Sequence, residues 1–316
     1  MTSHPLVSVI IPLYNHELFI EQCLNSVLED TYPCKEIVII DDGSRDSSAD
    51  IVQKWHSDHA IALGDNFKFV CRENRGLTRT LNELVLLARG ELIAVLASDD
   101  YLLAGGIAAR VAYLEQHPDK MAVFGDCKLV DYNGLISEKS GLSDLHNARI
   151  KHLNDPRLLS YEIVFNWCVP GPVFMARKGI FSLIGGYNEN IAVEDWDFYL
   201  RIAARDLLGF IDLPVAAYRI RPDDGTIEFT VQQHIRFNEA MLETVKNNLA
   251  HFKGLKRAYL FGEKLKFYGV LERLRGNKSP TAFLARKTGR LMENLLKALY
   301  SVWTRLIVPV LPPRST

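Results

Sequence analysis

The sequence is poor in cysteine and has no long uncharged apolar run. Its five cysteines are odd in number and widely spaced, and none forms a Cys-x-x-Cys pair. This argues against a disulfide framework or a zinc ribbon and favours a reducing compartment. No apolar stretch reaches the ~18 residues of a membrane-spanning helix. Residues 1–5 lack a basic segment, and the apolar run after them is short, so we predict a strand there and no signal peptide.

The net charge is also close to zero, but the acidic and basic residues are unevenly distributed along the chain. The 316 residues hold 37 basic and 38 acidic side chains, a net of −1. Residues 251–316 hold 14 basic and 3 acidic side chains, a net of +11, which leaves −12 on residues 1–250. We therefore predict an acidic body with a basic tail that meets an anionic partner. The apolar and charged fractions, 48% and 24%, are those of a globular protein and exclude a disordered one.

The first hundred residues alternate apolar runs with helical patterns. Strands are predicted over residues 7–13, 36–40, 67–71 and 92–97, and helices over 17–28, 47–59 and 78–88, with Asp46 as the N-cap of the second helix. Strands that are apolar throughout and alternate with helices indicate a parallel sheet covered on both faces. The expected fold class is α/β, an open and doubly wound domain whose ligand lies beyond the carboxyl ends of the strands.

Beyond residue 100 the alternation is less regular. We predict a helix over 104–117, a strand over 121–130, a loop over 137–155, a short strand over 173–175, a helix over 196–204 and an extended segment over 210–220. From about residue 229 only helical patterns remain, three or so, one of them ending near Gly276. The predicted domains are therefore residues 1–228 and a helical region over 229–316.

Three acidic clusters follow apolar segments. They are Asp41-Asp42-Gly43-Ser44, Ser98-Asp99-Asp100 and Glu194-Asp195-Trp196-Asp197. In a doubly wound sheet the first two clusters lie at the same edge, where a nucleotide binds. Adjacent carboxylates repel each other, and a divalent cation such as Mg²⁺ or Mn²⁺ relieves the repulsion while it takes phosphate oxygens.

Each cluster alone also has a purely structural interpretation. The first has the residue types of a turn. The second can cap the helix that follows it, and the third can supply first-turn acids to a helix. The functional interpretation depends on all three occurring in this order on an α/β frame.

In this order the motifs resemble those of the family 2 glycosyltransferases, inverting enzymes with the GT-A fold that include the bacterial surface-polysaccharide type. The resemblance covers roughly residues 6–222 and is carried by residues 7–15, 41–44, 74–76, Asn82, 88–90, 98–100, 170–172, 185–187, 194–201 and 218–219. It implies a Rossmann-like nucleotide-binding sheet, and the helical patterns beyond residue 229 add a C-terminal helical extension to it.

The resemblance also implies a reaction and its residues. A sugar moves from a nucleotide-diphosphate sugar, with a UDP-sugar favoured, to a hydroxyl of a glycan or lipid-linked acceptor. Asp195 matches the general base, and Asp99 and Asp100 match the region that holds Mn²⁺ or Mg²⁺ on the diphosphate. The donor residues implied are Pro12, Tyr14, Asn15, Asp41, Asp42, Arg75, Ser98, Asp99 and Arg221, and the acceptor-side residues are Gly171, Glu194 and Trp196.

Two departures from the family pattern keep alternatives open. Ala97 stands where many members have Asp, and Arg221 stands where many have His. Arginine cannot ligate a cation but can bind phosphate oxygens, so Arg221 either shares in neutralising the diphosphate or is a solvated loop residue. The departures also motivate a second hypothesis, a non-catalytic relative that binds nucleotide or glycan. A nucleotidyltransferase is a third, but the segment after the first strand is not a Gly-rich basic loop.

The remaining candidates have weaker signals. His16, His146 and His152 lack metal-ligand spacing and are predicted to be surface or loop residues. Trp167 and Tyr187 either stack on a sugar or pack in the core.

The basic tail contains one strongly amphipathic segment, near residues 290–308. Its polar residues recur at helical spacing in one stripe, the rest is apolar with Tyr300 and Trp303, and Pro309 stops the helix. The pattern predicts a helix lying on an anionic membrane surface, which places the protein in the cytoplasm, attached peripherally to the inner face of the cell membrane. The alternative is that this helix packs on the catalytic domain or on another subunit. No nucleic-acid motif is present, so no nucleic-acid partner is expected.

Overall fold

The computed structural model describes residues 4–191, 193–220 and 230–306. Its first half is the predicted α/β unit. Strands β1 (Val7–Leu13), β2 (Lys35–Asp41), β3 (Phe67–Cys71) and β4 (Leu92–Val95) are parallel, in the spatial order β3-β2-β1-β4. Side chains alternate along β1, so Val9 and Ile11 enter one core while Ile10 enters the other. This two-sided burial explains why the strand is apolar throughout.

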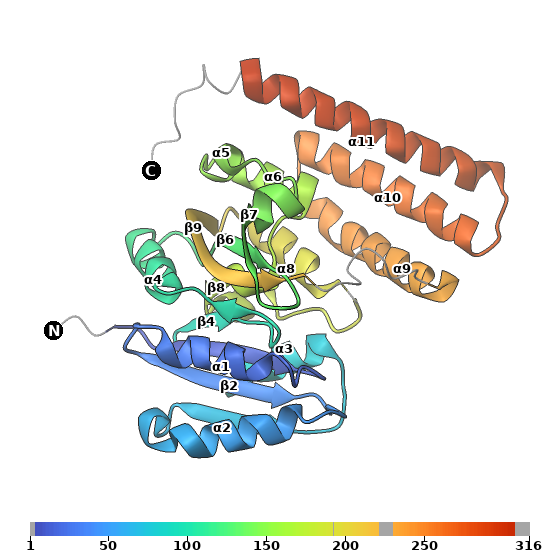
Figure 1. Ribbon diagram of the computed structural model, residues 1–316. Helices are drawn as coiled ribbons and strands as arrows, with labels where there is room; N and C mark the ends of the chain where they lie inside the picture. Colours follow the sequence, from blue (N-terminus) through green and yellow to red (C-terminus); the bar gives the residue numbers. More distant parts are fainter. Residues whose placement is uncertain (1–3, 192, 221–229, 307–316) are drawn as a thin grey trace.

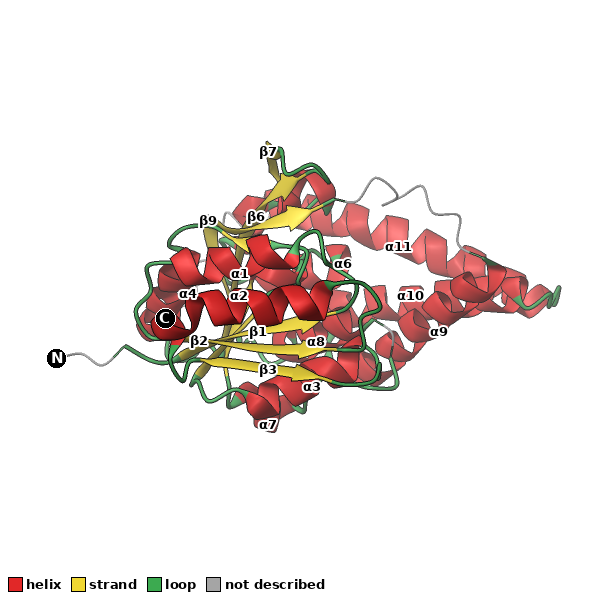
Figure 2. Cartoon of the chain, turned by 60° about the horizontal axis from the view of Figure 1, so that its bottom comes forward, coloured by secondary structure: helices red, strands yellow, loops and turns green. Residues whose placement is uncertain are grey.

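Helices cover both faces of the sheet. Helices α1 (Ile20–Glu29), α2 (Ser48–Leu63) and α4 (Gly106–Gln116) pack on one face, as Figure 2 shows, and α3 (Leu77–Leu87) packs on the other. The predicted N-cap of α2 is wrong by one residue, because Ser47 occupies that position. The Asp46 carboxylate instead accepts hydrogen bonds from the backbone N–H groups of Glu17 and Ser48 at 3.1 and 3.0 Å.

The second half of the domain continues the same sheet with mixed strand directions. Its strands are β5 (Tyr101–Leu102), β6 (Ala122–Val130), β7 (Ile136–Ser140), β8 (Phe174–Arg177) and β9 (Leu208–Arg219). Strand β8 is antiparallel to both β4 and β6 and joins the two halves, so the described residues form one nine-stranded sheet. The short helices α5 (Ile150–Leu153), α6 (Leu159–Asn166), α7 (Ile180–Ile184) and α8 (Glu194–Ala203) lie among these strands.

The predicted loop over residues 137–155 is wrong. That stretch contains most of β7, a π-helical turn over Gly141–Leu145 and α5. Among the described residues, strand β7 pairs with β6 alone, at the margin of the sheet, where Ile136 and Lys139 are exposed, and its sequence shows no apolar alternation. Helix α6 is also missing from the sequence prediction, because its residues are buried nearly all round and show no helical period.

The C-terminal region is a set of helices, α9 (Val231–Asn248), α10 (Gly254–Leu274) and α11 (Pro280–Leu306). The C-cap of α10 is one residue before Gly276, whose φ is +81°, as the sequence predicts. Helices α10 and α11 form a hairpin at the outside of the molecule (Figure 1). Their backbones meet at glycines: a Cβ on Gly289 would lie 2.4 Å from the backbone nitrogen of Lys266.

The tail helix α11 uses one face for packing and leaves another exposed. Tyr300 is only 2% exposed and stacks on Tyr161 and Phe165, so for this residue the alternative holds, in which the helix packs on the catalytic domain and not on lipid. In the predicted polar stripe, Glu293 faces α10 and pairs with Lys266 and Lys297. The helical period alone cannot tell a membrane-facing side from a side that packs on protein. Over the described residues, no helix is both long and apolar enough to cross a membrane.

Candidate active site

A cavity of about 530 Å³ opens beyond the carboxyl ends of β1, β2 and β4. It is lined by Pro12, Leu13, Tyr14, His16, Asp42, Asn74, Gly76, Leu77, Thr80, Ala97, Ser98 and Asp99. Five predicted donor residues therefore come together here, namely Pro12, Tyr14, Asp42, Ser98 and Asp99. The cause is the topology, since parallel strands bring the residues that follow them to one edge of the sheet.

A second cavity, of about 450 Å³, shares Gly76 and Leu77 with the first. Its lining includes Arg75 and Glu194, so a predicted donor residue and a predicted acceptor-side residue face one space. The second cavity therefore lies beside the first, and Glu194 in its lining is the first residue of α8.

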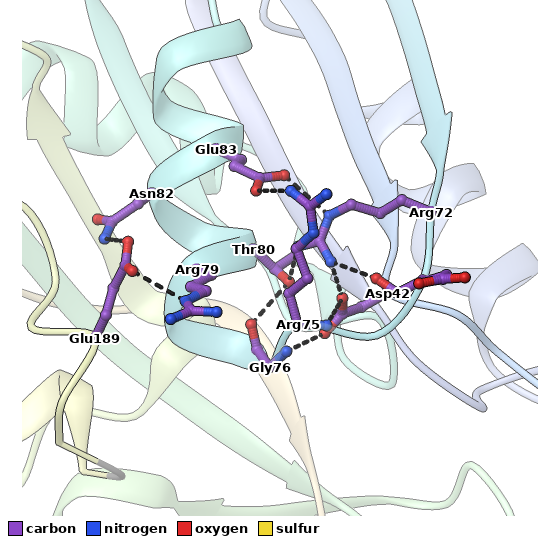
Figure 3. Close-up of polar contacts among 10 residues, drawn as sticks. Asp42, Arg72, Arg75, Gly76, Arg79, Thr80, Asn82, Glu83 and Glu189 are labelled. Atoms are coloured by element: carbon purple, nitrogen blue, oxygen red, sulfur yellow. Dashed lines mark hydrogen bonds and ion pairs between the residues drawn. The ribbon is translucent and has the colours of Figure 1, made fainter.

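Asp42 holds the loop between β3 and α3 (Figure 3). Its carboxylate accepts hydrogen bonds from the backbone N–H groups of Arg75 and Gly76, both at 2.8 Å, and forms a buried ion pair with Arg72. Arg72 in turn donates to Glu83 and Thr80 on α3. Asp42 thus fixes the Gly76–Leu77 wall that the two cavities share.

Asp41 and Asn15 lie outside the lining of the first cavity. The buried Asp41 carboxylate accepts the Ser44 N–H at 2.8 Å, as in the turn that the sequence offered as the structural alternative. Asn15 has a positive φ of 53°, and its side-chain oxygen accepts the Arg45 N–H at 2.8 Å. Asn15 therefore links the loop after β1 to the loop after β2, and Asp41 stabilises the second of these loops from within.

Asp99 and Asp100 point in different directions. Asp99 lines the cavity and its side chain is 13% exposed. Asp100 is buried, and its carboxylate accepts the backbone N–H of Arg219 at 2.8 Å. The guanidinium of Arg219 donates to the Asp99 carbonyl at 2.8 Å, so one arginine fixes the backbone of this turn.

The geometry of this turn bears on the predicted metal. The residues described include no group of three or more His, Cys, Asp or Glu side chains that would hold a metal by themselves. Mg²⁺ is usually bound by one or two carboxylates together with substrate phosphates. Asp99 at the cavity wall therefore fits a cation that arrives with a diphosphate, whereas Asp100 is engaged by the backbone of β9.

His16 is a site residue that the sequence did not predict. Its Nδ1 lies 2.7 Å from the hydroxyl of Ser98, and its Nε2 lies 3.8 Å from the carboxylate of Asp99. Its partners are more than 80 residues away in sequence, so no spacing rule could find them. The available signal was its position directly after the first strand.

The third acidic cluster forms the first turn of α8, where burial changes the acidity of two carboxyl groups. Burial raises the pKa of Asp195 to about 6, opposed by the hydrogen bond that the Trp196 N–H donates to its carboxylate at 2.6 Å. Burial and the charge of Asp195 raise the pKa of Glu194 to about 7. Both groups therefore exchange protons near neutral pH, as a general base must.

Other motif residues hold the segment that precedes α8. The Asn82 side chain accepts the Tyr187 N–H at 2.9 Å and donates to the Tyr187 carbonyl at 2.9 Å. Arg201 donates to the carbonyls of Ile184, Gly185 and Gly186. These contacts explain why Asn82 and the Gly-Gly-Tyr motif occur together, because they place the chain that leads to Asp195.

The remaining predicted residues have the following positions. Trp196 is buried against Trp167, with ring centroids 5.6 Å apart, and Tyr187 is core, packed on Phe198. Gly171 begins a short 3-10 helix, Gly171–Val173, and has open space where a Cβ would lie. His152 is buried within α5, so the prediction of a surface or loop residue is wrong for it, whereas His146 lies in the turn after Gly141–Leu145, as predicted, and is partly buried. Arg221 lies outside the described residues.

The fold and the site together define a nucleotide-binding α/β protein of the GT-A type. Residues 8–171 match the family model "Glycosyl transferase family 2". The chain therefore belongs to the family 2 glycosyltransferases, as the sequence motifs predict.

Similar proteins extend this result. The chain is 30% identical to the chondroitin synthase of Escherichia coli over 63% of its own length, but it spans only 26% of that relative. TarS 1-349 of S. aureus in complex with UDP-GlcNAc has a TM-score of 0.62 at 18% identity, over 94% of this chain and 91% of that one. The mannosyltransferase PcManGT from Pyrobaculum calidifontis, in complex with GDP-Man and Mn²⁺, has a TM-score of 0.59 at 20% identity, over 96% and 88%. At these identities the two structures establish the fold.

Proposed function

We propose that the chain is an inverting glycosyltransferase of surface-polysaccharide synthesis, such as O-antigen, capsule or exopolysaccharide. It transfers a sugar from a nucleotide-diphosphate sugar to a hydroxyl of a glycan or a lipid-linked acceptor. The observation that carries the proposal is the pair of neighbouring cavities that share Gly76 and Leu77, with Asp99 lining the first and Glu194, the residue before Asp195, lining the second. The family and the nucleotide sugars bound by TarS and PcManGT support a donor of this class.

Different residues of the chain have different roles in the proposed reaction. The donor nucleotide lies along Pro12, Tyr14 and Asp42, and its diphosphate lies toward Asp99 and His16. The acceptor hydroxyl attacks the anomeric carbon from the side of α8. A new C–O bond forms as the bond to the nucleoside diphosphate breaks, and Asp195 takes the hydroxyl proton. A divalent cation, Mn²⁺ or Mg²⁺, held by Asp99 and the donor phosphates, would offset the charge on the leaving diphosphate.

A thermal-shift screen of nucleotide sugars, with and without Mn²⁺, tests the donor class. At about 100 times the Kd, one donor among UDP-GlcNAc, UDP-glucose, UDP-galactose and GDP-mannose should raise Tm by roughly 3–8 °C. The rise should be smaller without Mn²⁺ and in Asp99→Asn. If no nucleotide sugar binds, the donor proposal is wrong. If one binds but no nucleoside diphosphate is ever released, the non-catalytic alternative is favoured.

We also propose that the exposed face of α11 attaches the protein to the inner face of the cell membrane. Leu284, Leu291, Leu295, Leu299 and Val302 are each about half or more exposed, and their spacing places them in one stripe. Lys287, Arg290 and Arg305 are also exposed on this helix. A basic helix with an apolar stripe is suited to an anionic lipid surface.

Vesicle binding tests this attachment. Replacing Leu291, Leu295 and Leu299 by Gln should weaken sedimentation with phosphatidylglycerol vesicles about tenfold or more, because the apolar area that enters the bilayer is lost. Ile61→Gln is the matched control, since Ile61 is fully exposed on α2 at a different face. Equal binding by the triple variant and the control would count against the proposal.

A further inference from the structure

His16 lies against Ser98 and Asp99 in the wall of the first cavity. Its Nδ1 lies 2.7 Å from the Ser98 hydroxyl, and its Nε2 lies 3.8 Å from Oδ2 of Asp99. The second distance is longer than an N–H···O hydrogen bond, which spans about 2.7–3.2 Å. Two atoms that each ligate one cation at roughly 2.1 Å lie roughly 3–4 Å apart. The spacing of Nε2 and the Asp99 carboxylate is therefore that of two ligands of one ion.

The backbone of His16 is fixed at the start of α1. Its N–H donates to the Ser48 hydroxyl at 2.9 Å, and its carbonyl accepts the N–H groups of Phe19 and Ile20, both at 3.0 Å. The side chain is 18% exposed, and its ring lies edge-on to Phe19, with centroids 6.4 Å apart. These contacts hold the imidazole at the cavity wall, so little further ordering is needed when a ligand binds it.

The contact with Ser98 determines which nitrogen can bind a cation. Ser98 is buried, and when its hydroxyl accepts the Nδ1–H of His16, the lone pair of the imidazole is on Nε2, the atom that faces Asp99. Histidines that bind metals usually donate their other ring N–H to an oxygen in this way, which fixes the tautomer and the ring orientation. Mn²⁺, a transition metal, accepts imidazole more readily than Mg²⁺, which takes oxygen ligands.

The turn that carries Asp99 supplies fewer acids than the family pattern. Ala97, which also lines the cavity, has no side-chain oxygen where many members have Asp. The Ala97 carbonyl accepts the Asp100 N–H at 3.0 Å, and the Asp100 carboxylate binds the backbone of β9. Asp99 is thus the carboxylate of this turn that lines the cavity. A nitrogen from His16 provides a second group on the other side of the same space.

We propose that His16, through Nε2, is the second protein ligand of the divalent cation at the donor diphosphate, and that it sets a preference for Mn²⁺ over Mg²⁺. The proposal rests on the proposed function and adds His16 to the Asp99 and phosphate oxygens named there. Two protein ligands agree with the described part of the chain having no cluster of three or more metal-binding side chains.

Pulsed electron paramagnetic resonance of Mn²⁺ bound together with UDP, or with GDP if only GDP binds, tests this ligation. The wild type should show modulation from a directly coordinated nitrogen, and its frequencies should change when the protein is prepared with ¹⁵N-labelled histidine. His16→Phe keeps a ring beside Phe19 and should lose the modulation. His56→Phe is the matched control and should keep it, since His56 is a partly buried histidine of α2 that stacks on Phe67.

Calorimetric titration of each metal in the presence of the same nucleotide measures the preference. His16→Phe should lower the affinity for Mn²⁺ about tenfold and leave the affinity for Mg²⁺ within about twofold, because only Mn²⁺ gains from the imidazole. An unchanged ratio of the two affinities in His16→Phe would contradict the preference that His16 is proposed to set.

The outcomes separate this proposal from the proposed function. If the nucleotide and Mn²⁺ bind without nitrogen modulation, or if His16→Phe keeps the modulation, ligation by His16 is wrong and the glycosyltransferase proposal stands. If neither UDP nor GDP binds the wild type, the proposed donor site is wrong, and the ligand role of His16 is wrong with it.

Discussion

Asp195→Asn is expected to lower the kcat of sugar transfer by about 10²–10⁴-fold and to leave the donor KM within about twofold. Asparagine has nearly the same shape but cannot accept the hydroxyl proton. The donor cavity is lined by residues from the ends of β1, β2 and β4 and from α3, and Asp195 is not among them. Steady-state release of the nucleoside diphosphate over a range of donor concentrations measures both constants.

The activity of the wild type should fall as the pH is lowered. Asp195 acts as a base only when ionised, so kcat/KM should fall about tenfold per pH unit below a pKa of about 6. Glu194, with a pKa of about 7, is close enough to couple to it, so the measured limb belongs to the pair.

The stability of the fold should instead fall as the pH rises over the same range. Both carboxyl groups have a raised pKa in the folded state, so the folded chain holds protons that the unfolded chain releases. Their contribution to stability is therefore present at low pH and is lost as the pH rises through 6 and 7. Asp195→Asn should make this loss of stability smaller, whereas Glu115→Gln, on the exposed side of α4, should change neither the stability profile nor the activity profile with pH.

An Asp195→Asn variant that keeps more than half of the wild-type kcat would contradict the role of the base.

The sequence predicted the first half of the fold well because its signals there are local. Strand β1 has the predicted bounds, and β2 to β4 differ from theirs by at most two residues, since strands buried on both faces must be apolar throughout. The second half depends on contacts between distant segments. Strand β7 is defined by its pairing with β6, and α6 by a core that surrounds it, so neither carries a periodic signal.

In the candidate site, too, some features could be predicted from local sequence and others depend on distant contacts. Residue types and their order were enough to bring Pro12, Tyr14, Asp42 and Asp99 to one cavity. They could not show that the Asp100 side chain points away from this cavity and binds the backbone of β9. Nor could they show that His16 contacts the side chains of Ser98 and Asp99. Both outcomes depend on side-chain direction, which is set by partners more than 80 residues away.

The tail illustrates a limit of amphipathic patterns. A wide apolar face on α11 is compatible with lipid and with protein, and the structure packs only part of that face on protein. Tyr300 and Leu296 are buried, while Leu291 and Leu295 remain exposed. The positive charge of the tail indicated an anionic partner but could not indicate which side of the helix would meet it.

Arg219→Ala is expected to lower the free energy of unfolding by about 3–4 kcal/mol, a large effect for a single residue. The arginine is buried, and its guanidinium donates to the carbonyls of Asp99 and Asp131 and to the Gln22 side chain. It also lies over the ring of Phe19, 4.4 Å from the centroid. Alanine would leave these partly buried acceptors without their donor and would empty the buried space that the arginine fills.

The same change should weaken donor binding, because Arg219 fixes the turn that carries Asp99. Urea unfolding measures the stability, and calorimetric titration with UDP or GDP in the presence of Mn²⁺ measures the affinity, which should fall about tenfold in the fraction that folds. Arg205→Ala, an exposed arginine just after α8, should change stability by no more than about 0.5 kcal/mol. If Arg219→Ala were destabilised but bound the nucleotide as tightly as the wild type, Arg219 would support the fold alone, and the position of Asp99 would have to be set by other contacts.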